Sequence, residues 1–450
     1  MSASTTGRPR LPLHTRILLG LLVGAVGGIV SNILWHGSPA LGWFVDNVAN
    51  TVGQIFLRML FMVVVPLVFT SVALGVASLG DVRRIGRIGT KTLLTFLGTT
   101  AIAAVIGLVL VNAIQPGGSI DPEVRTALME EYSSQAGEKV TAAETNRFGI
   151  NTFVNIVPRN PVTAAAGGDM LGLIFFTLIF GIALTMIPIA ASEPVVKVLE
   201  GISQAVMVII DFAMRLAPLG VAGLLFSVTA KFGFDVLQSL LWYVVTVLLG
   251  LAVHQFLVIP LLARGLAGIS PATFFRRVRA LMVTAISTSS SNATLPTTIR
   301  TATDEFGVPR EVAGFVLPLG ATMNMNGTAL FEGMTVLFLA QVFGVHLDLL
   351  TQVIVVVMAV ITAVGVAGVP SGSIPLLVMV LGMVGVPGEG IALVLGVDRI
   401  LDMARTVPNV TGDLLTSLLI TKSEGLPFGP TADQGRWTLE EGQSVGGRRQ

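Results

Sequence analysis

Long apolar runs alternate with short polar segments over the first part of the chain. Six runs have the length of about 20 residues that a bilayer crossing requires; they lie at 15–35, 55–79, 92–114, 168–190, 201–228 and 236–264. Runs of this length predict transmembrane helices. The first run lacks a clear small-residue cleavage site, so we interpret it as a retained span and not as a signal peptide.

A polar segment at 115–165 separates the third run from the fourth. It contains four prolines, and its six acidic residues outnumber its four basic residues. We therefore expect a long external loop. Three basic clusters lie an odd number of crossings away from it, so the positive-inside rule assigns them to the cytoplasmic side. The clusters are Arg8, Arg10 and Arg16; Arg83, Arg84, Arg87 and Lys91; and Arg276, Arg277 and Arg279.

Beyond residue 270, small polar residues, glycine and proline interrupt the apolar segments. Two interruptions have a similar character, STSSSNATLPTT at 287–298 and GVAGVPSGSIP at 365–375. Irregular backbone at membrane depth persists only where protein or a cavity satisfies its polar groups. Paired broken segments are typical of transporters built from inverted repeats. Two ordinary kinked helices or two external loops remain the alternative.

Five polar residues lie on one face of the last apolar segment: Asp398, Asp402, Arg405, Asn409 and Asp413. At roughly 100° per residue they fall within an arc of about 80°. A charge at the bilayer centre costs about 2.5–3.5 kcal/mol even on the lenient insertion scale. This stripe therefore faces a protein interior or a watery cavity, and it indicates a site for ions and a charged solute.

The composition supports a polytopic all-α membrane protein. Of the 450 residues, 53% are hydrophobic and only 12% are charged, and the mean hydropathy is +0.83. The chain has no cysteine, which excludes disulfides and thiolate metal sites, and its four histidines have no metal-ligand spacing. The net charge of +1 indicates no particular partner, and we expect no nucleic-acid binding.

Several long motifs resemble the glutamate transporter family, that is the dicarboxylate/amino acid:cation symporters. They cover most of 15–421 and comprise the serine-rich run 288–296, GATMNMNGTAL at 320–330, the Gly-Val-Pro tip at 368–370, DMARTVPNVTGD at 402–413, the helix 56–81 and APLGV at 217–221. The archaeal member is known for its inverted repeats. The resemblance implies eight transmembrane helices, two re-entrant helical hairpins and elevator-type transport.

The resemblance also implies a division of the chain. Helices one to six occupy 15–270 and the transport core occupies 271–421, with hairpins at about 272–303 and 348–385. Helices one, two, four and five form a trimeric scaffold, whereas helices three and six belong to the moving domain. A cytoplasmic N-terminus at 1–14 and a disordered cytoplasmic tail at 422–450 complete the expected organisation.

Two charged residues match the family's substrate-binding positions. Asp402 matches the partner of the substrate amino group, and Arg405 matches the group that binds the side-chain carboxylate. Together they favour an acidic amino acid; a structural ion pair at i, i+3 is the alternative. The other matching substrate positions are Ser290, Ser291, Thr328, Val369, Gly372, Thr406 and Asn409. Each of these could instead be only a turn residue, and for Val369 and Gly372 taken singly that interpretation is favoured.

The resemblance places a sodium ion at Asp413 and Asn409, with the backbone of Asn324 contributing; a packing or capping role for Asp413 is the alternative. A second sodium site departs from the family pattern. Its usual aspartate is Asn326, and Phe96 replaces a tyrosine of the archaeal transporter. Thr99 and Thr100 remain there. Because one charge and one hydroxyl are missing, we expect fewer coupled sodium ions.

Glu332 matches the acid that resembles the proton carrier of the family's animal members. Burial favours the neutral form of a carboxyl, so Glu332 indicates proton coupling; neutralisation by Arg399 or by solvent is the alternative. Arg399 is itself a departure, because other members place this arginine where the chain has Ser289 or Met403. We expect Arg399 to compensate the charge of Asp402, or to pair with Asp398.

These observations predict a symporter that imports glutamate or aspartate with sodium, protons or both, in the plasma (inner) membrane of a prokaryote. A C4-dicarboxylate symporter is the alternative, although Asp402 would be idle in it. Arg405 argues against a neutral amino acid. An intramembrane aspartyl protease is disfavoured because Asp398 and Asp402 share one helix, and an anion leak stays open. We expect no enzyme activity and no cofactor besides the coupling ions.

Overall fold

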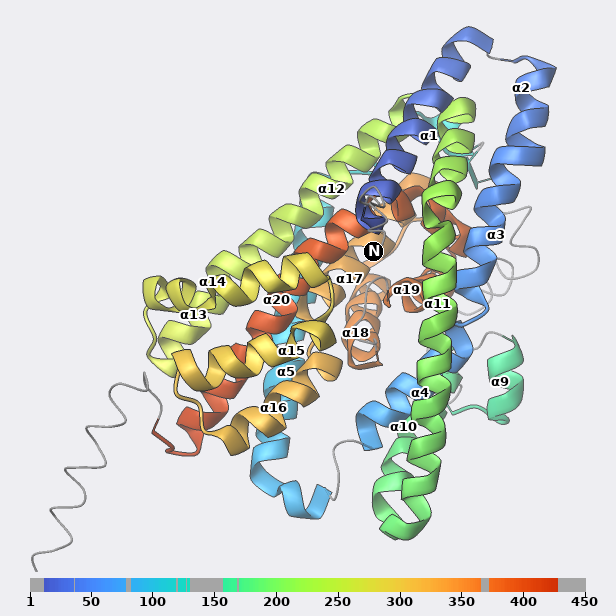
Figure 1. The fold of residues 1–450 in the computed structure, drawn as a ribbon. Helices are drawn as coiled ribbons and strands as arrows, with labels where there is room; N and C mark the ends of the chain where they lie inside the picture. Colours follow the sequence, from blue (N-terminus) through green and yellow to red (C-terminus); the bar gives the residue numbers. More distant parts are fainter. Residues whose placement is uncertain are drawn as a thin grey trace, which may run out of the picture.

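The computed structural model describes residues 12–35, 37–77, 82–118, 120–126, 128–129, 157–167, 170–365 and 372–427. Every regular element in these residues is a helix, which confirms the all-α prediction (Figure 1). Most of the predicted loop at 115–165, the first 11 residues and the tail from 428 lie outside the described residues. What the sequence predicts for them stays a prediction.

The first three apolar runs form helices that begin before the predicted spans. They comprise α1 (Leu13–Trp35), α2 (Pro39–Phe44), the π-helical turn η1 (Val45–Ala49), α3 (Asn50–Phe61), α4 (Val64–Ala77) and α5 (Val82–Ile114). The second helical stretch runs over Pro39–Ala77, whereas the hydropathy of the sequence predicts a span only at 55–79. Asp46 and Asn47 lower the hydropathy of its first part, and both are exposed.

The middle of the chain forms α9 (Pro161–Gly167), α10 (Met170–Met186), α11 (Ile189–Phe232), α12 (Asp235–Val253), the π-helical turns η2 (His254–Val258) and η3 (Ala263–Ala267), and α13 (Ile259–Leu262) between those turns. At 1.5 Å per residue, α11 is about 66 Å long, roughly twice the hydrocarbon core of a bilayer. Its charged first turns, with Glu193 and Lys197, are exposed, which explains why hydropathy predicts only 201–228.

Five helical stretches within the described residues are long and apolar enough to cross a bilayer: Thr15–Trp35, Pro39–Ala77, Arg87–Ile114, Ile189–Phe232 and Asp235–Ala267. Gly172–Met186 and Leu349–Ala363 are shorter apolar helices. The fourth predicted span, 168–190, corresponds to the first of these shorter helices. The chain is therefore a multi-pass membrane protein by length and composition.

The last third of the chain folds into paired, interrupted helices. They are α14 (Pro271–Thr288), α15 (Ser291–Arg300), the π-helical turn η4 (Thr301–Glu305), α16 (Arg310–Met323), α17 (Asn326–Phe343), α18 (Leu349–Gly365), α19 (Ile374–Met383), the 3₁₀ turn η5 (Gly388–Ile391) and α20 (Ala392–Ser423). Pairs α14–α15 and α18–α19 are helical hairpins that break within 287–298 and 365–375, where the sequence has its two interruptions. Residues 366–371 of the second break lie outside the described residues.

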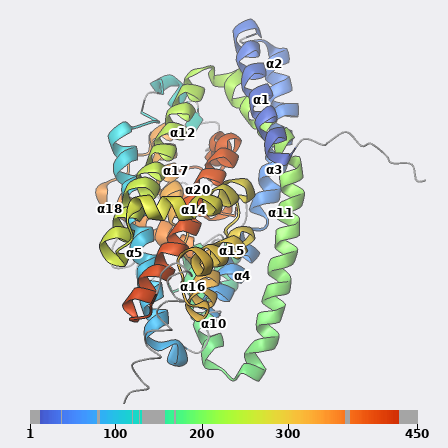
Figure 2. The ribbon, with the colours of Figure 1, turned by 60° about the vertical axis from the view of Figure 1, so that its left-hand side comes forward.

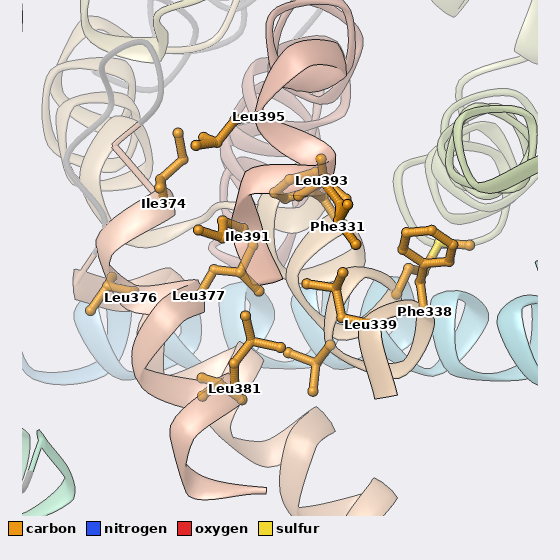
Figure 3. Packing of buried hydrophobic residues seen from close by; sticks show 14 of the residues in the cluster. Phe331, Phe338, Leu339, Ile374, Leu376, Leu377, Leu381, Ile391, Leu393 and Leu395 are labelled. Atoms are coloured by element: carbon orange, nitrogen blue, oxygen red, sulfur yellow. The ribbon is translucent and has the colours of Figure 1, made fainter. Parts of the chain in front are cut away.

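Helices α17 and α20 occupy the centre of the molecule. Helix α20 contacts α14, α15, α16 and α17 as well as α1 and α11, and Figures 1 and 2 both show α14 lying across it. All of α17 except Gln341 is buried, including Glu332. Figure 3 shows Phe331 and Leu339 of α17 packed with Leu377 of α19 and Leu393 of α20. The second hairpin thus packs directly on the two central helices.

Glycines let α1 approach α11 backbone to backbone. A Cβ atom on Gly20 would lie 2.2 Å from the carbonyl oxygen of Pro218, and one on Gly24 would lie 2.4 Å from that of Ala222. The spacing of four residues continues at Gly28, and small residues at this spacing are typical of close helix packing in membranes. The two helices therefore require glycine at these positions.

We expect Gly24→Leu to destabilise the protein, because its side chain must push α1 away from α11. Overpacking of this kind costs about 1–3 kcal/mol. Gly201→Leu on α11 is the matched control, since Gly201 faces open space. Thermal unfolding of the full chain in detergent measures the effect. Equal unfolding temperatures for the two variants would contradict this account of the α1–α11 packing.

An ion-pair cluster joins the start of α5 to the end of α20. Lys91 donates to Oε1 of Glu424 at 2.7 Å, and Arg87 also pairs with this carboxylate. Lys91 additionally donates to the carbonyl oxygen of Ser423 at 3.1 Å. The hydrogen bonds from Lys91 and Arg87 lower the pKa of Glu424 below its ordinary value.

Glu424→Gln should therefore lower the thermal stability at neutral pH and leave it nearly unchanged at acid pH. A carboxyl with a depressed pKa contributes stability above its ordinary pKa, and this contribution is lost as the pH falls through the folded-state value. Unfolding temperatures between about pH 3 and pH 7 test this, with Glu193→Gln of an exposed pair as the control. A constant difference at every pH would contradict it.

Candidate substrate and cation site

Helix α20 carries the polar stripe, and the fold buries all of it. Asp398, Asp402, Arg405, Asn409 and Asp413 are each at most 4% exposed. The helix is surrounded by α14, α15, α16 and α17, which all pack on it. Burial of three carboxylates and a guanidinium requires partners, and the surrounding elements supply them.

Arg405 neutralises the first two carboxylates of the stripe, Asp398 and Asp402. Its Nη2 and Nε atoms donate to Oδ1 of Asp402 at 2.7 and 3.0 Å, and its Nη1 lies 3.3 Å from Oδ1 of Asp398. The guanidinium also lies 4.2 Å from the ring centre of Phe331, a cation–π contact. The structure thus contains the i, i+3 ion pair that the sequence offers as an alternative. A buried ion pair does not exclude ligand binding, because a guanidinium has five donors in a planar fork.

Arg399 lies beside the same carboxylate. Its Nη1 is 3.6 Å from Oδ2 of Asp402, and its side chain is 16% exposed. Asp398 and Arg399 also line a small cavity against Ile17 of α1 and Ile374 of α19. Asp402 therefore has positive charge on both sides, and Asp398 pairs with Arg405.

Asn409 connects α20 to the start of α17. Its Oδ1 accepts a hydrogen bond from the backbone N–H of Gly327 at 2.8 Å, and its Nδ2 donates to Thr328 at 3.2 Å. A Cβ atom on Gly327 would lie 2.3 Å from the carbonyl oxygen of Arg405, so glycine is required for this approach. Thr406 donates to the carbonyl oxygen of Asp402 at 2.7 Å. The predicted substrate positions on α17 and α20 are thus adjacent.

A second group of polar atoms surrounds the break between α16 and α17. The backbone leaves helical geometry at Asn324 (φ −119°, ψ 75°), and Nδ2 of Asn324 donates to Oδ1 of Asp413 at 2.9 Å. From sequence we expect a backbone contribution from Asn324, whereas the contact seen is through its side chain. A Cβ atom on Gly320 would lie 2.5 Å from Oδ1 of Asp413, so this carboxylate sits against bare backbone.

The third group lies on α5, facing the same break. Thr100 donates to Oδ1 of Asn326 at 2.8 Å, and Thr99 lies 3.4 Å from Oδ1 of both Asn324 and Asn326. Phe96 is buried one turn earlier, at 1% exposed. The amide of Asn326 thus occupies the centre of a neutral network.

The first hairpin presents serines at its tip. Ser289 adopts a left-handed conformation (φ 49°), and the hydroxyl of Ser290 accepts from the N–H of Ala293 at 3.2 Å, which caps α15. Ser290 and Ser291 are buried, and α15 packs on α20. Gly372 is also buried at the start of the second arm, whereas Val369 lies outside the described residues.

Comparisons with known proteins identify the family of the chain. The model of the sodium:dicarboxylate symporter family matches residues 13–423. The chain belongs to this family. Members are secondary transporters and not enzymes.

Curated relatives match over nearly their whole length. The chain is 35% identical over 417 residues to the "Proton/glutamate-aspartate symporter" of Escherichia coli, covering 92% of the chain and 93% of the relative. It is 35% identical over 424 residues to the "Proton/sodium-glutamate symport protein" of Bacillus subtilis, covering 94% and 95%. A "C4-dicarboxylate transport protein" of Rhodospirillum rubrum is 30% identical over 423 residues, covering 93% and 91%.

In this family member, Glu332 has a partner that sequence reasoning missed. Its Oε2 accepts a hydrogen bond from Thr362 of α18 at 2.6 Å, whereas the sequence suggests Arg399 or solvent. Both residues are 1% exposed. The available signal was a lone hydroxyl within the apolar run 353–365 of the second hairpin, but only the tertiary structure shows which carboxyl it meets.

Proposed function

We propose that this chain imports an acidic amino acid, glutamate or aspartate, by symport with sodium, protons or both. The observation that carries this proposal is the buried pair of Asp402 and Arg405 on α20. Asp402 offers a carboxylate to a substrate ammonium, and Arg405 offers a fork to a side-chain carboxylate. Two opposite charges held 2.7 Å apart in a buried site are complementary to a zwitterion that carries one extra acid.

The names of the relatives support the same substrate class. The two relatives at 35% identity are glutamate or glutamate-aspartate symporters, whereas the C4-dicarboxylate transporter is 30% identical. Import of a C4-dicarboxylate such as succinate is the second candidate. It requires only positive charge in the site, and Asp402 would then oppose the substrate.

Two further features bear on the coupling ions. Asp413, Asn409 and Asn324 together offer the hard oxygen ligands that sodium prefers. The network of Thr99, Thr100 and Asn326 has oxygens but no carboxylate, so we propose that it holds sodium weakly or not at all. Protons load on Glu332 instead. Metal clusters of acidic and histidine side chains are absent from the described residues.

The proposed mechanism is an elevator in the inner membrane of a prokaryote. Helices one, two, four and five form the scaffold of a homotrimer. The two hairpins, α14–α15 and α18–α19, are re-entrant and move with α5, α12, α17 and α20 among eight transmembrane helices. Substrate and cation each stabilise the state in which the second hairpin closes.

Uptake of radiolabelled L-aspartate into proteoliposomes tests this function, with a sodium gradient or a proton gradient imposed alone. Uptake driven by sodium would assign coupling to the Asp413 site. Uptake driven only by protons would assign it to Glu332. Succinate uptake without aspartate uptake would overturn the amino-acid proposal in favour of the second candidate. Lack of uptake of either substrate under both gradients would overturn both.

A further inference from the structure

Thr362 joins the buried carboxyl of Glu332 to the second helical hairpin. It lies on α18, three residues before that helix ends at Gly365. Glu332 lies on α17, where Oε1 has no hydrogen-bond partner among the described residues. The contact of 2.6 Å between Thr362 and Oε2 is therefore the hydrogen bond that the carboxyl makes within this part of the chain.

The hydroxyl of Thr362 has two close oxygen neighbours and a single hydrogen. Its oxygen lies 2.6 Å from Oε2 of Glu332 and 2.7 Å from the carbonyl oxygen of Met358, whereas the carbonyl oxygen of Ala359 lies farther away, at 3.2 Å. If the carboxyl is ionised, both neighbours are acceptors, and only one of the two short contacts contains a hydrogen. If the carboxyl is protonated, it donates to Thr362, which donates in turn to Met358. Both short contacts are then hydrogen bonds.

The charged groups near Glu332 lie on α20. Arg405 of α20 attracts the carboxylate of Glu332 electrostatically, and it forms ion pairs with Asp398 and Asp402. On α12, Tyr243 bonds to Thr335, one turn away. Residues 92–114 of α5 and all of α18 and α19 contain no acidic or basic residue. Thr362 is therefore the polar contact to Glu332 from the hairpin side.

We propose that Thr362 is a positioning residue that transmits the protonation state of Glu332 to the second hairpin. Loading a proton from water lets the Thr362 hydroxyl donate to the carbonyl oxygen of Met358. Loss of that proton turns the hydroxyl back toward the carboxylate and removes this bond. The inference rests on the proposed role of Glu332 in proton coupling, and it adds the element through which the proton acts.

The consequence falls on the last turn of α18. A threonine hydroxyl that bonds to the carbonyl of residue i−4 bends a helix slightly. Making or breaking the bond from Thr362 to Met358 therefore changes the direction of the last turn of α18, up to Gly365. The other arm, α19, packs on α17 and α20 (Figure 3). A change in the last turn of α18 therefore alters how this arm packs against α19 and α17.

The test is aspartate uptake by the full chain in proteoliposomes as a function of external pH. Thr362→Val removes the hydroxyl and keeps the shape, so the ionised carboxyl loses its donor. We expect the pH midpoint of uptake to rise by about one unit, the equivalent of one hydrogen bond to a charged group. The KM for aspartate should stay within about twofold, since Thr362 binds no substrate, and Thr362→Ser should restore the wild-type midpoint.

The variant Glu332→Gln separates this inference from the proposed function. If it leaves the pH profile unchanged, Glu332 carries no proton, and the proposed roles of Glu332 and Thr362 both fail, whereas sodium-coupled aspartate uptake still stands. If it flattens the profile while Thr362→Val keeps the wild-type midpoint, the role of Thr362 alone is overturned. If both act, the double variant should behave like Glu332→Gln, because Thr362 works through the carboxyl. If the losses of uptake in the two single variants instead add up in the double variant, the role of Thr362 is merely structural.

A spectroscopic measurement covers the case in which Thr362→Val transports too slowly to assay. Infrared difference spectra of reconstituted protein at two pH values show the C=O band of a protonated carboxyl, and the band lost in Glu332→Gln belongs to this residue. That band should shift in frequency in Thr362→Val and return in Thr362→Ser. An unshifted band would show that the hydroxyl does not bond to the protonated carboxyl, which would overturn the inference.

Discussion

Replacing Arg405 with cysteine should abolish aspartate and glutamate uptake. The change removes the group proposed to bind the substrate carboxylate, and it also leaves Asp398 and Asp402 buried without their shared counter-charge. Truncating one partner of a buried, hydrogen-bonded charge pair in a binding site costs about 2–5 kcal/mol, so we expect at least about a 30-fold loss of aspartate affinity. The smaller, neutral side chain should admit serine or alanine, which the same assay detects with labelled substrates.

The control for Arg405→Cys is Arg300→Cys, since the native chain has no cysteine and Arg300 is largely exposed. It should transport aspartate as the unmodified protein does. Unchanged aspartate affinity in Arg405→Cys would remove this arginine from the substrate site. Thermal unfolding of both variants in detergent distinguishes lost recognition from lost folding.

The second large effect is expected for Asp413→Asn. Asp413 is 2% exposed, and its Oδ1 accepts from Asn324 beside the bare backbone of Gly320. An amide keeps the shape but removes the full negative charge that a sodium ion requires. Sodium titrations of aspartate uptake, without a proton gradient, should show at least about a tenfold loss of sodium affinity, which corresponds to about 1.4 kcal/mol.

The matched control is Asp304→Asn, because this aspartate is exposed and pairs only weakly with Arg300 at 3.5 Å. Its sodium titration should follow that of the unmodified protein. A wild-type titration in Asp413→Asn would assign the residue to capping or packing, the alternative that the sequence offers. Retained proton-driven uptake in the same variant would indicate that the two ions bind at separate places.

The two predictions concern two sites along one helix, α20. Arg405 and Asp402 lie one turn apart, whereas Asp413 lies two turns further along α20, next to the break at Asn324. Asn409 lies between them and bonds to Gly327 and Thr328. Binding at the Arg405 site or at the Asp413 site therefore affects the same unwound segment between α16 and α17. We expect sodium and substrate to bind cooperatively for this reason.

The sequence by itself determined the fold class and the composition of the site. Apolar runs of spanning length predict membrane helices because the backbone in lipid must satisfy its own hydrogen bonds. The period of 3.6 residues puts Asp398, Asp402, Arg405, Asn409 and Asp413 on one face, and all five are buried in the structure. The glycine- and serine-rich interruptions likewise mark the places where α14 and α18 end.

Only the tertiary structure decided which of these groups meet. The partners of Glu332 and Asp413 are Thr362 and Asn324, which lie 30 and 89 residues away along the chain. Hydropathy also underestimates α11, because charged turns that extend beyond the apolar span still belong to one continuous helix from Ile189 to Phe232. Local periodicity reports the face on which a residue lies, whereas the partner on another helix depends on how the helices pack, which no single segment encodes.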